Sequence, residues 1–332
     1  MRISWLLLLG IGVVGAGGVI AWLALDNNPI SSKPASGLQN NPASGPSSLT
    51  PTSGAQAGPI DQQLAQLQAQ LNQGGPAYTQ AAEELIRIGT RESIRMLVLD
   101  IANREPTNET YQALHKLAEQ KNRAIADWLL ELLPQLPKSE EQSFQLKLLA
   151  EILGIKASPE TLRSIGALAQ SAPDVQTKDF LFGAIASSGS EADTIPVLMD
   201  FAVLPDWQAE GRASVSVAAS FALGKQGSPA AVRFLFLQQA AEPSVEAPGT
   251  QGLEKVQSAN SLPLLLSIAK GTEPTFKEVS SRQVAIGVLG NIKHEEGWHT
   301  LRELQQDPDP QISQTAKVTL KQVSNRFGIE FE

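Results

Sequence analysis

The hydrophobic pattern is clearest in residues 281–323, where apolar residues recur at helical spacing in three successive stretches. The first stretch ends at Leu289, and a glycine follows it as a helix stop. The same spacing resumes at Trp298, and it begins again at Ile312 after the break at 307–310, which reads D-P-D-P. The pattern predicts three consecutive amphipathic helices joined by short links.

The same alternation of helices and short breaks extends from residue 60 to residue 327 and predicts helices that come in pairs. The predicted pairs are 77–88 with 91–103, 108–119 with 123–133, 140–153 with 159–170, 175–187 with 192–203, 207–223 with 229–240, 244–256 with 261–269 and 275–289 with 295–305. The segment 244–256 contains one proline and two internal glycines, so we expect this helix to be broken.

One further helix is predicted at each end of this series. A stripe of apolar residues at 60–71 precedes the first pair, and a helix at 311–327 follows the last pair. We expect the N-terminal helix to cap the first pair, because stacked repeats need terminal caps; a short coiled coil with a partner is the alternative.

The second helices of the pairs begin in a similar way. Four of them open with an apolar residue, an arginine, a variable residue and a second apolar residue; the arginines are Arg95, Arg163, Arg233 and Arg302. Pro196 and Pro263 occupy the same slot in two others, where a helix tolerates proline because its first amide hydrogens have no partner within the helix. With Ala126 in the slot of the remaining pair, the slot recurs along the chain at the period of a two-helix repeat.

Glycines recur near the ends of the first helices of alternate pairs. They follow one another at a nearly constant spacing, at Gly89, Gly154, Gly224 and Gly290. Because glycine adopts the left-handed conformation at little cost, we expect each of them to end its helix as a left-handed cap.

The helix end at Leu289-Gly290 and the D-P-D-P link at 307–310 resemble the HEAT-like repeats named after phycobilisome lyases. In those repeats a helix ending in A-L-G is followed by a short turn, a helix that opens with V-P-x-L, and a D-P-D-P-type link. The resemblance implies an all-α fold, an α-solenoid of about seven HEAT-like helical pairs with terminal capping helices. Because phycobilisome lyases attach or detach bilins, the resemblance also leaves a lyase-like enzyme or enzyme subunit as an alternative function.

The N-terminal segment predicts a membrane anchor. Residues 3–25 contain no charged residue and are long enough to cross a bilayer as a helix, with Trp5 and Trp22 near the two ends. Arg2 precedes the segment and Asp26 follows it, so the positive-inside rule places the N-terminus in the cytoplasm. We therefore expect a single-pass protein of the bacterial inner membrane with a periplasmic repeat domain. The alternative is a signal peptide that is cleaved after the small residues at 14–16.

Composition divides the chain into three parts. Residues 1–25 form the predicted anchor, and residues 26–58 are rich in Asn, Pro, Ser and Gly, which predicts a disordered linker because this segment has little apolar surface to bury. Residues 59–332 form the predicted HEAT-like repeat domain, in which acidic residues outnumber basic ones. This acidic balance argues against nucleic-acid binding, which requires a basic surface.

The sequence does not support a catalytic, cofactor or metal site. The chain contains no cysteine, and its three histidines are His115, His294 and His299. The spacing of the last two does not place both rings on one face of a helix, so we expect solvated surface histidines rather than metal ligands.

The arginines of the slot are the candidate binding residues. Arg95, Arg163, Arg233 and Arg302 recur at almost equal spacing, on equivalent helices of alternate pairs. With second helices on the concave side of the solenoid, the four would form a ladder that binds an acidic segment of a partner protein. In the alternative interpretation, each arginine covers a helix turn with its aliphatic stem and pairs with a neighbouring acidic residue.

These observations predict a non-catalytic, membrane-tethered HEAT-repeat scaffold or adaptor that binds another protein in the cell envelope. Two alternatives stay open. One is the lyase-like enzyme or enzyme subunit, and the other is a cleaved, soluble periplasmic chaperone or inhibitor.

Overall fold

The computed structural model describes residues 59–137, 143–189, 191–211 and 213–329, and these residues form helices and no strand. The predicted anchor at 3–25 and the predicted linker at 26–58 lie outside the described residues. Within the described part, no helix is both long enough and apolar enough to span a bilayer.

Apart from the four-residue helix α10 (Trp207–Glu210), the described α-helices form seven consecutive pairs with one additional helix at each end, which confirms the predicted all-α repeat fold. The first helices are α2 (Gly75–Ile88), α4 (Asn108–Glu119), α6 (Ser143–Lys156), α8 (Val175–Ser187), α11 (Val215–Gln226), α13 (Pro248–Leu253) and α15 (Val279–Leu289). The second helices are α3 (Arg91–Asn103), α5 (Ala124–Leu132), α7 (Pro159–Ser171), α9 (Ile195–Ala202), α12 (Pro229–Ala241), α14 (Leu262–Ala269) and α16 (Glu295–Leu304). The terminal helices are α1 (Pro59–Gln73) and α17 (Pro310–Phe327).

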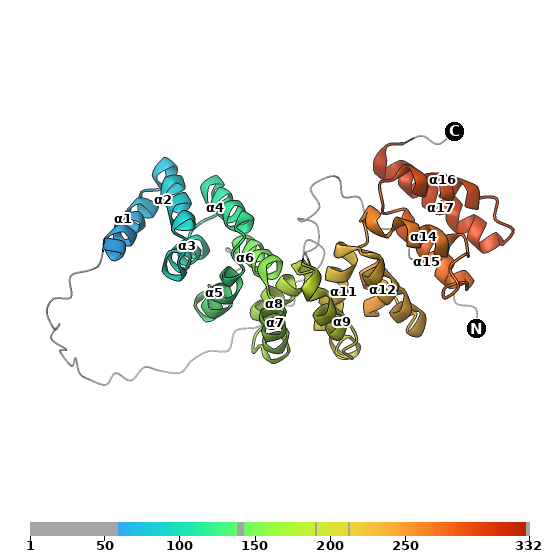
Figure 1. The fold of residues 1–332 in the computed structure, drawn as a ribbon, viewed down its shortest axis with the longest axis horizontal. Coiled ribbons are helices and arrows are strands. Elements are labelled where there is room, and N and C mark those ends of the chain that lie inside the picture. Colours follow the sequence, from blue (N-terminus) through green and yellow to red (C-terminus); the bar gives the residue numbers. More distant parts are fainter. Residues whose placement is uncertain (1–58, 138–142, 190, 212, 330–332) are drawn as a thin grey trace, which may run out of the picture.

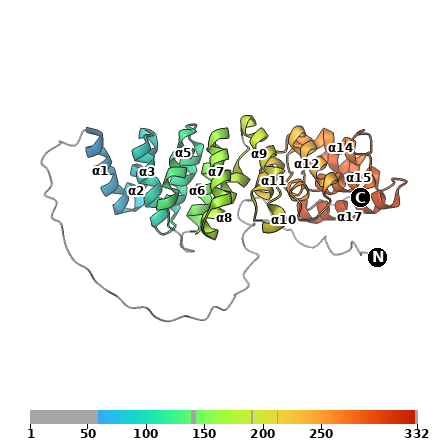
Figure 2. The same ribbon diagram turned by 90° about the horizontal axis from the view of Figure 1, so that it is seen from below.

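The pairs stack side by side into an elongated array of two layers. First helices contact first helices of the neighbouring pairs, as in α4 with α6 and α6 with α8, and second helices contact second helices, as in α5 with α7. Figure 2 shows the two layers as two rows, with α3, α5, α7, α9 and α12 in one row. The leucines of α1 at 64, 67 and 71 are buried, and α1 packs on α2 and α3 as the N-terminal end of the array.

The array is bent, and the second helices lie on the outer side of the bend from α3 to α12 (Figure 1). The first helices α2, α4, α6 and α11 lie along the inner side (Figure 1). The contacts agree with this view, because α6 and α8 pack together far more extensively than α5 and α7 or α7 and α9. In this part of the array the expectation that second helices line the concave side is therefore wrong.

Hydrogen bonds from backbone amides to capping side chains define where several second helices begin. The side chains of Thr90, Ser158 and Ser228 accept hydrogen bonds from backbone amides in the first turns of α3, α7 and α12. Proline follows the cap in α7 and α12, where its fixed φ favours a helix start. In all three helices the capping residue lies five positions before the slot arginine, so the slot falls at an equivalent position in each.

Only one of the four glycines expected as left-handed caps adopts that role. Gly89 ends α2 with a φ of 62°. Gly154 and Gly224 lie inside α6 and α11, and Gly290 follows α15 with a right-handed φ of −65°. The expectation of a left-handed cap is wrong at these three positions.

Two of these glycines, Gly154 and Gly224, instead allow adjacent first helices to approach closely. A Cβ atom added at Gly154 would lie 2.0 Å from the carbonyl oxygen of Ala184 in α8. A Cβ atom at Gly224 would lie 2.0 Å from the carbonyl oxygen of Gly252 in α13. Any larger residue would force the backbones of two helices apart, so the recurrent glycine follows from helix–helix packing.

The fifth pair departs from the predicted single helix at 207–223. A short helix, α10 (Trp207–Glu210), is followed by Gly211 with a φ of 60°, and α11 starts only at Val215. The Asp206 carboxylate accepts hydrogen bonds from the amide of Val215 at 2.8 Å and from the hydroxyl of Ser216 at 2.5 Å. These bonds hold the start of α11, which is buried over most of its length. In the sixth pair, the predicted break in 244–256 is confirmed, because α13 covers only Pro248–Leu253.

Basic side chains from one first helix cap the C-terminus of the preceding first helix. The Lys156 amine of α6 donates hydrogen bonds to the carbonyl oxygens of Ala118 and Gln120, at the end of α4. The Lys225 amine of α11 donates to the carbonyl of Ala186, at the end of α8. Burial lowers the pKa of Lys156, and the carbonyl oxygens offset part of that cost because helix C-termini carry partial negative charge.

We predict that Gly154→Ala and Gly287→Ala have opposite effects on stability. Gly154→Ala places a methyl group against a backbone carbonyl and should lower the free energy of unfolding by about 1–3 kcal/mol. Gly287 lies in α15 with no atom within 4 Å of the added methyl group, so Gly287→Ala should raise it by up to about 1 kcal/mol. Urea unfolding followed by circular dichroism measures both. Equal effects of the two substitutions would contradict a close-packing role for Gly154.

Candidate functional site

The four candidate arginines lie at equivalent positions on four separate second helices. Arg95 is on α3, Arg163 on α7, Arg233 on α12 and Arg302 on α16. The residue before each of them is fully buried in the core, while the arginines themselves are exposed or, for Arg233, half-buried. The structure therefore places them along the row formed by the second helices, called the second-helix row below. It does not bring them together into one cluster.

Two of these arginines bond to the next pair in the array. The Arg95 guanidinium donates to the side-chain oxygen of Gln135, three residues after the end of α5, at 2.9 Å. The Arg233 guanidinium donates to the carboxylate of Glu273, four residues after the end of α14, at 3.0 Å. It also lies 5.8 Å from the centre of the Phe276 ring. At these two positions the arginine connects adjacent second helices, as the structural interpretation of the sequence predicts.

Arg163 differs from Arg95 and Arg233. Its side chain is exposed on α7 and makes no hydrogen bond or ion pair with the residues that the structure describes. By contrast, Arg91, which lies one turn before Arg95 in α3, is exposed and yet pairs with Glu131 of α5. An exposed arginine is therefore not automatically an unpaired one in this array.

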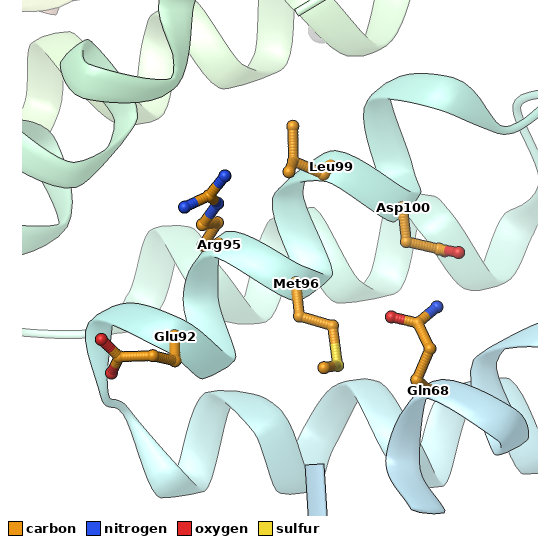
Figure 3. Close-up of a pocket in the computed structure, with 6 residues that line it drawn as sticks. All are labelled: Gln68, Glu92, Arg95, Met96, Leu99 and Asp100. Carbon is orange, nitrogen blue, oxygen red and sulfur yellow. The ribbon is translucent and has the colours of Figure 1, made fainter. Parts of the chain in front are cut away.

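An open pocket of about 440 Å³ lies between α1 and α3, and Arg95 is part of its wall. Figure 3 shows Gln68 of α1 beside Asp100 at one end of the pocket, Glu92 at the other end and Met96 between them. Asp100 is already paired with Arg104 at 2.9 Å. The polar groups do not point to a common centre, so they are poorly arranged to hold a small ligand.

A buried tyrosine from α2 lies close to this pocket. Tyr78 is 1% exposed, and its ring lies 5.0 Å from the guanidinium carbon of Arg104. Burial raises the pKa of the Tyr78 hydroxyl above its usual value, so this group stays protonated at neutral pH. A group held in one protonation state is poorly suited to acid–base chemistry.

Two of the three histidines each lie close to one glutamate. His115 lies 3.2 Å from Glu119 and His299 lies 3.1 Å from Glu303, each one helical turn away on an exposed surface. His294 immediately precedes α16. Among the described residues, no three His, Cys, Asp or Glu side chains come together in a way that could hold a metal ion.

The positions of the slot arginines could be predicted from the sequence. Which of these arginines bond to the next pair could not. Whether a slot arginine is paired depends on the segment that follows the second helix of the next pair, which is distant in the sequence. No short motif connects these positions. The pocket between α1 and α3 was also missed, because it depends on the angle at which α1 packs and not on a residue pattern.

We predict that Arg233→Gln and Arg163→Gln differ in their effect on stability. The hydrogen bond from Arg233 lowers the pKa of Glu273 in the folded protein, so this pair contributes stability at neutral pH and loses it as the pH falls through that lowered pKa. Thermal unfolding at neutral pH should therefore show a lower Tm for Arg233→Gln than for the wild type. The difference should shrink below about pH 4, where free glutamate is protonated.

Arg163→Gln is the matched control, since it removes the same charge at the same slot. We expect its Tm to equal that of the wild type throughout the pH range. A Tm loss as large as that of Arg233→Gln would mean that Arg163 also serves the fold.

We find no family model that matches the chain, and no curated protein matches it. Among solved structures, the chain is similar to human deoxyhypusine hydroxylase in complex with glycerol, with 15% sequence identity and a TM-score of 0.28. The alignment covers 80% of this chain and 96% of that one. A TM-score this low carries no argument about function. The assignment of a HEAT-like helical repeat fold therefore rests on the stacked helix pairs themselves.

Proposed function

We propose that the chain is a non-catalytic scaffold of the phycobilisome-lyase-type HEAT-repeat class that binds another protein through its second-helix row. The observation that carries this proposal is the exposure of arginines at one register of that row, on α3, α7 and α16. A row of similar side chains spaced by two or four repeats suits an extended protein segment better than a small molecule. The open pocket between α1 and α3, whose polar groups diverge, supports the same conclusion.

Exposed apolar side chains add to the argument for a protein partner. Leu168 on α7, Val203 after α9 and Leu237 on α12 are 42%, 62% and 48% exposed. Interfaces between proteins combine apolar contacts with arginine, which can both stack on a partner and bond to its carboxylates. The partner that fits this surface is a protein with an acidic segment.

We further propose that residues 3–25 anchor the scaffold in the inner membrane of a bacterium, with the N-terminus in the cytoplasm. The length of this uncharged stretch and the position of Arg2 before it support this arrangement. Residues 26–58, as a flexible coil, would hold the repeat domain roughly 30 Å from the anchor. The scaffold would then recruit its partner close to the periplasmic face of the membrane.

Photocrosslinking in intact cells tests the binding surface. A photoreactive amino acid at Leu237 of α12 should form a crosslink to another protein, because this side chain lies on the second-helix row. The control is Tyr111 of α4, which is 42% exposed but belongs to the first-helix layer. A crosslink from Tyr111 alone, or from neither site, would contradict the proposal.

Protease treatment of spheroplasts tests the anchor and its orientation. We expect externally added protease to cut within residues 26–58 and to release a folded fragment that mass spectrometry identifies as the repeat domain. The linker is the expected cleavage site because its composition does not support a packed structure. Cleavage only in inverted vesicles would reverse the orientation, and a mature N-terminus after residue 16 would show that the anchor is removed.

A further inference from the structure

The bonds made by Arg95 and Arg233 define what the slot arginine normally contacts. Each reaches a residue 40 positions ahead in the sequence, in the short segment that follows the second helix of the next pair. These acceptors are Gln135 and Glu273, which follow the ends of α5 and α14 by three and four residues. The array therefore contains a repeated contact between a slot arginine and an oxygen acceptor of the next pair.

At Arg163 this contact is missing for an identifiable reason. The equivalent segment, after the end of α9, comprises residues 203–206, and its one acidic residue is Asp206. The Asp206 carboxylate faces the start of α11, where it accepts hydrogen bonds from the Val215 amide and the Ser216 hydroxyl. The carboxylate that could accept a hydrogen bond from Arg163 is therefore already bonded to the start of α11, in the fifth pair.

Two contacts join the neighbouring second helices α7, α9 and α12 close to Arg163. The ring of Phe201 in α9 packs against α7 at Gly166, where an added Cβ atom would lie 2.4 Å from it. The Gln238 side chain of α12 donates a hydrogen bond to the carbonyl of Ala202 at 2.7 Å, which joins α12 to the end of α9. These contacts join the end of α9, just before the exposed Val203, to both α7 and α12.

We propose that Arg163, Val203 and Leu237 form a docking site for a partner segment that carries a carboxylate beside apolar residues. The partner's carboxylate takes the place at Arg163 that Glu273 takes at Arg233. Its apolar side chains cover Val203, which is 62% exposed, and Leu237, which is 48% exposed. This inference rests on the proposed protein-binding function and locates it on one part of the second-helix row.

The chemistry of the site favours a carboxylate over other acceptors. The guanidinium group of Arg163 presents parallel N–H donors that match the two oxygens of a carboxylate. Apolar neighbours that become covered in the complex exclude water and strengthen this charge-assisted bond. In a repeat domain that is acidic overall, an arginine with no partner among the described residues also favours a partner whose negative charge is confined to a short segment.

Selection from a random peptide library tests the site on the full-length chain in detergent. Phage-displayed dodecapeptides are panned against the wild type, and the selected peptides are then measured by fluorescence anisotropy. We expect them to combine Asp or Glu with neighbouring Leu, Ile, Val or Phe. Arg163→Gln should weaken their binding about tenfold or more, because a hydrogen bond between charged groups is worth at least that factor.

A second substitution closes the site without removing Arg163. Pro205 is exposed and follows the end of α9 by three residues, as Gln135 follows the end of α5. Pro205→Glu therefore supplies the missing carboxylate within the chain and should weaken peptide binding to the same extent. The control is Arg91→Gln, which removes an exposed arginine that already pairs with Glu131 and should leave binding unchanged.

The possible results separate this inference from the proposed function. Selected peptides without an acidic residue, no enrichment at all, or equal binding by the wild type and Arg163→Gln would overturn the docking site. In each of these cases a crosslink from Leu237 in cells would still support protein binding by the second-helix row. Loss of binding in Arg163→Gln and Pro205→Glu, but not in Arg91→Gln, supports the docking site.

Discussion

The close approach of neighbouring first helices is the constraint on which this array depends. At Gly154 and Gly224 the backbone of one first helix lies so near the carbonyl oxygen of the next that a methyl group does not fit between them. Helices packed this closely shorten one layer relative to the other. The array therefore bends toward its first helices from α2 to α11, and the second helices lie on the outer side (Figure 1). The lysines that cap the preceding helix ends act in the same layer, so most of the cohesion between pairs comes from the inner side.

In the second-helix row, side chains can therefore differ between pairs with little loss of stability. One slot arginine connects to Gln135 and another to Glu273, which reinforces the stack at two positions. Arg163 has the same place in its helix, but its potential acceptor is used to start α11. A local rearrangement of the fold thus leaves the Arg163 guanidinium without a bonding partner among the described residues, and a partner protein can use an exposed arginine of this kind.

The repeat fold could be predicted from the sequence because the repeat is a local pattern. Apolar spacing, capping residues and the proline or arginine slot all act within one or two turns of a helix, and the structure confirms the paired helices that they predict. Gly154 and Gly224 were identified but misinterpreted as helix caps. Their role depends on Ala184 and Gly252, which belong to the next pair in the sequence and become neighbours only when the helices pack.

The pairing of the arginines could not be predicted for the same reason. Nothing near Arg163 or Arg233 in the sequence distinguishes them, since the difference lies in Asp206 and Glu273 at the ends of other helices. Asp206 lies before the break at Gly211, and its carboxylate bonds to residues at the start of α11, beyond that break. The direction of the bend is equally non-local, because it follows from the relative spacing of two layers.

Packing between first helices thus holds the array together, and we propose that the second-helix row binds the partner protein. Hydrogen exchange of the full-length chain, with and without a bound peptide selected for affinity, tests this division most directly. We expect the peptide to slow exchange in α7, α9 and α12 and to leave α6, α8 and α11 unchanged. Slower exchange confined to α6 and α8 would place recognition on the inner side of the bend and contradict this division.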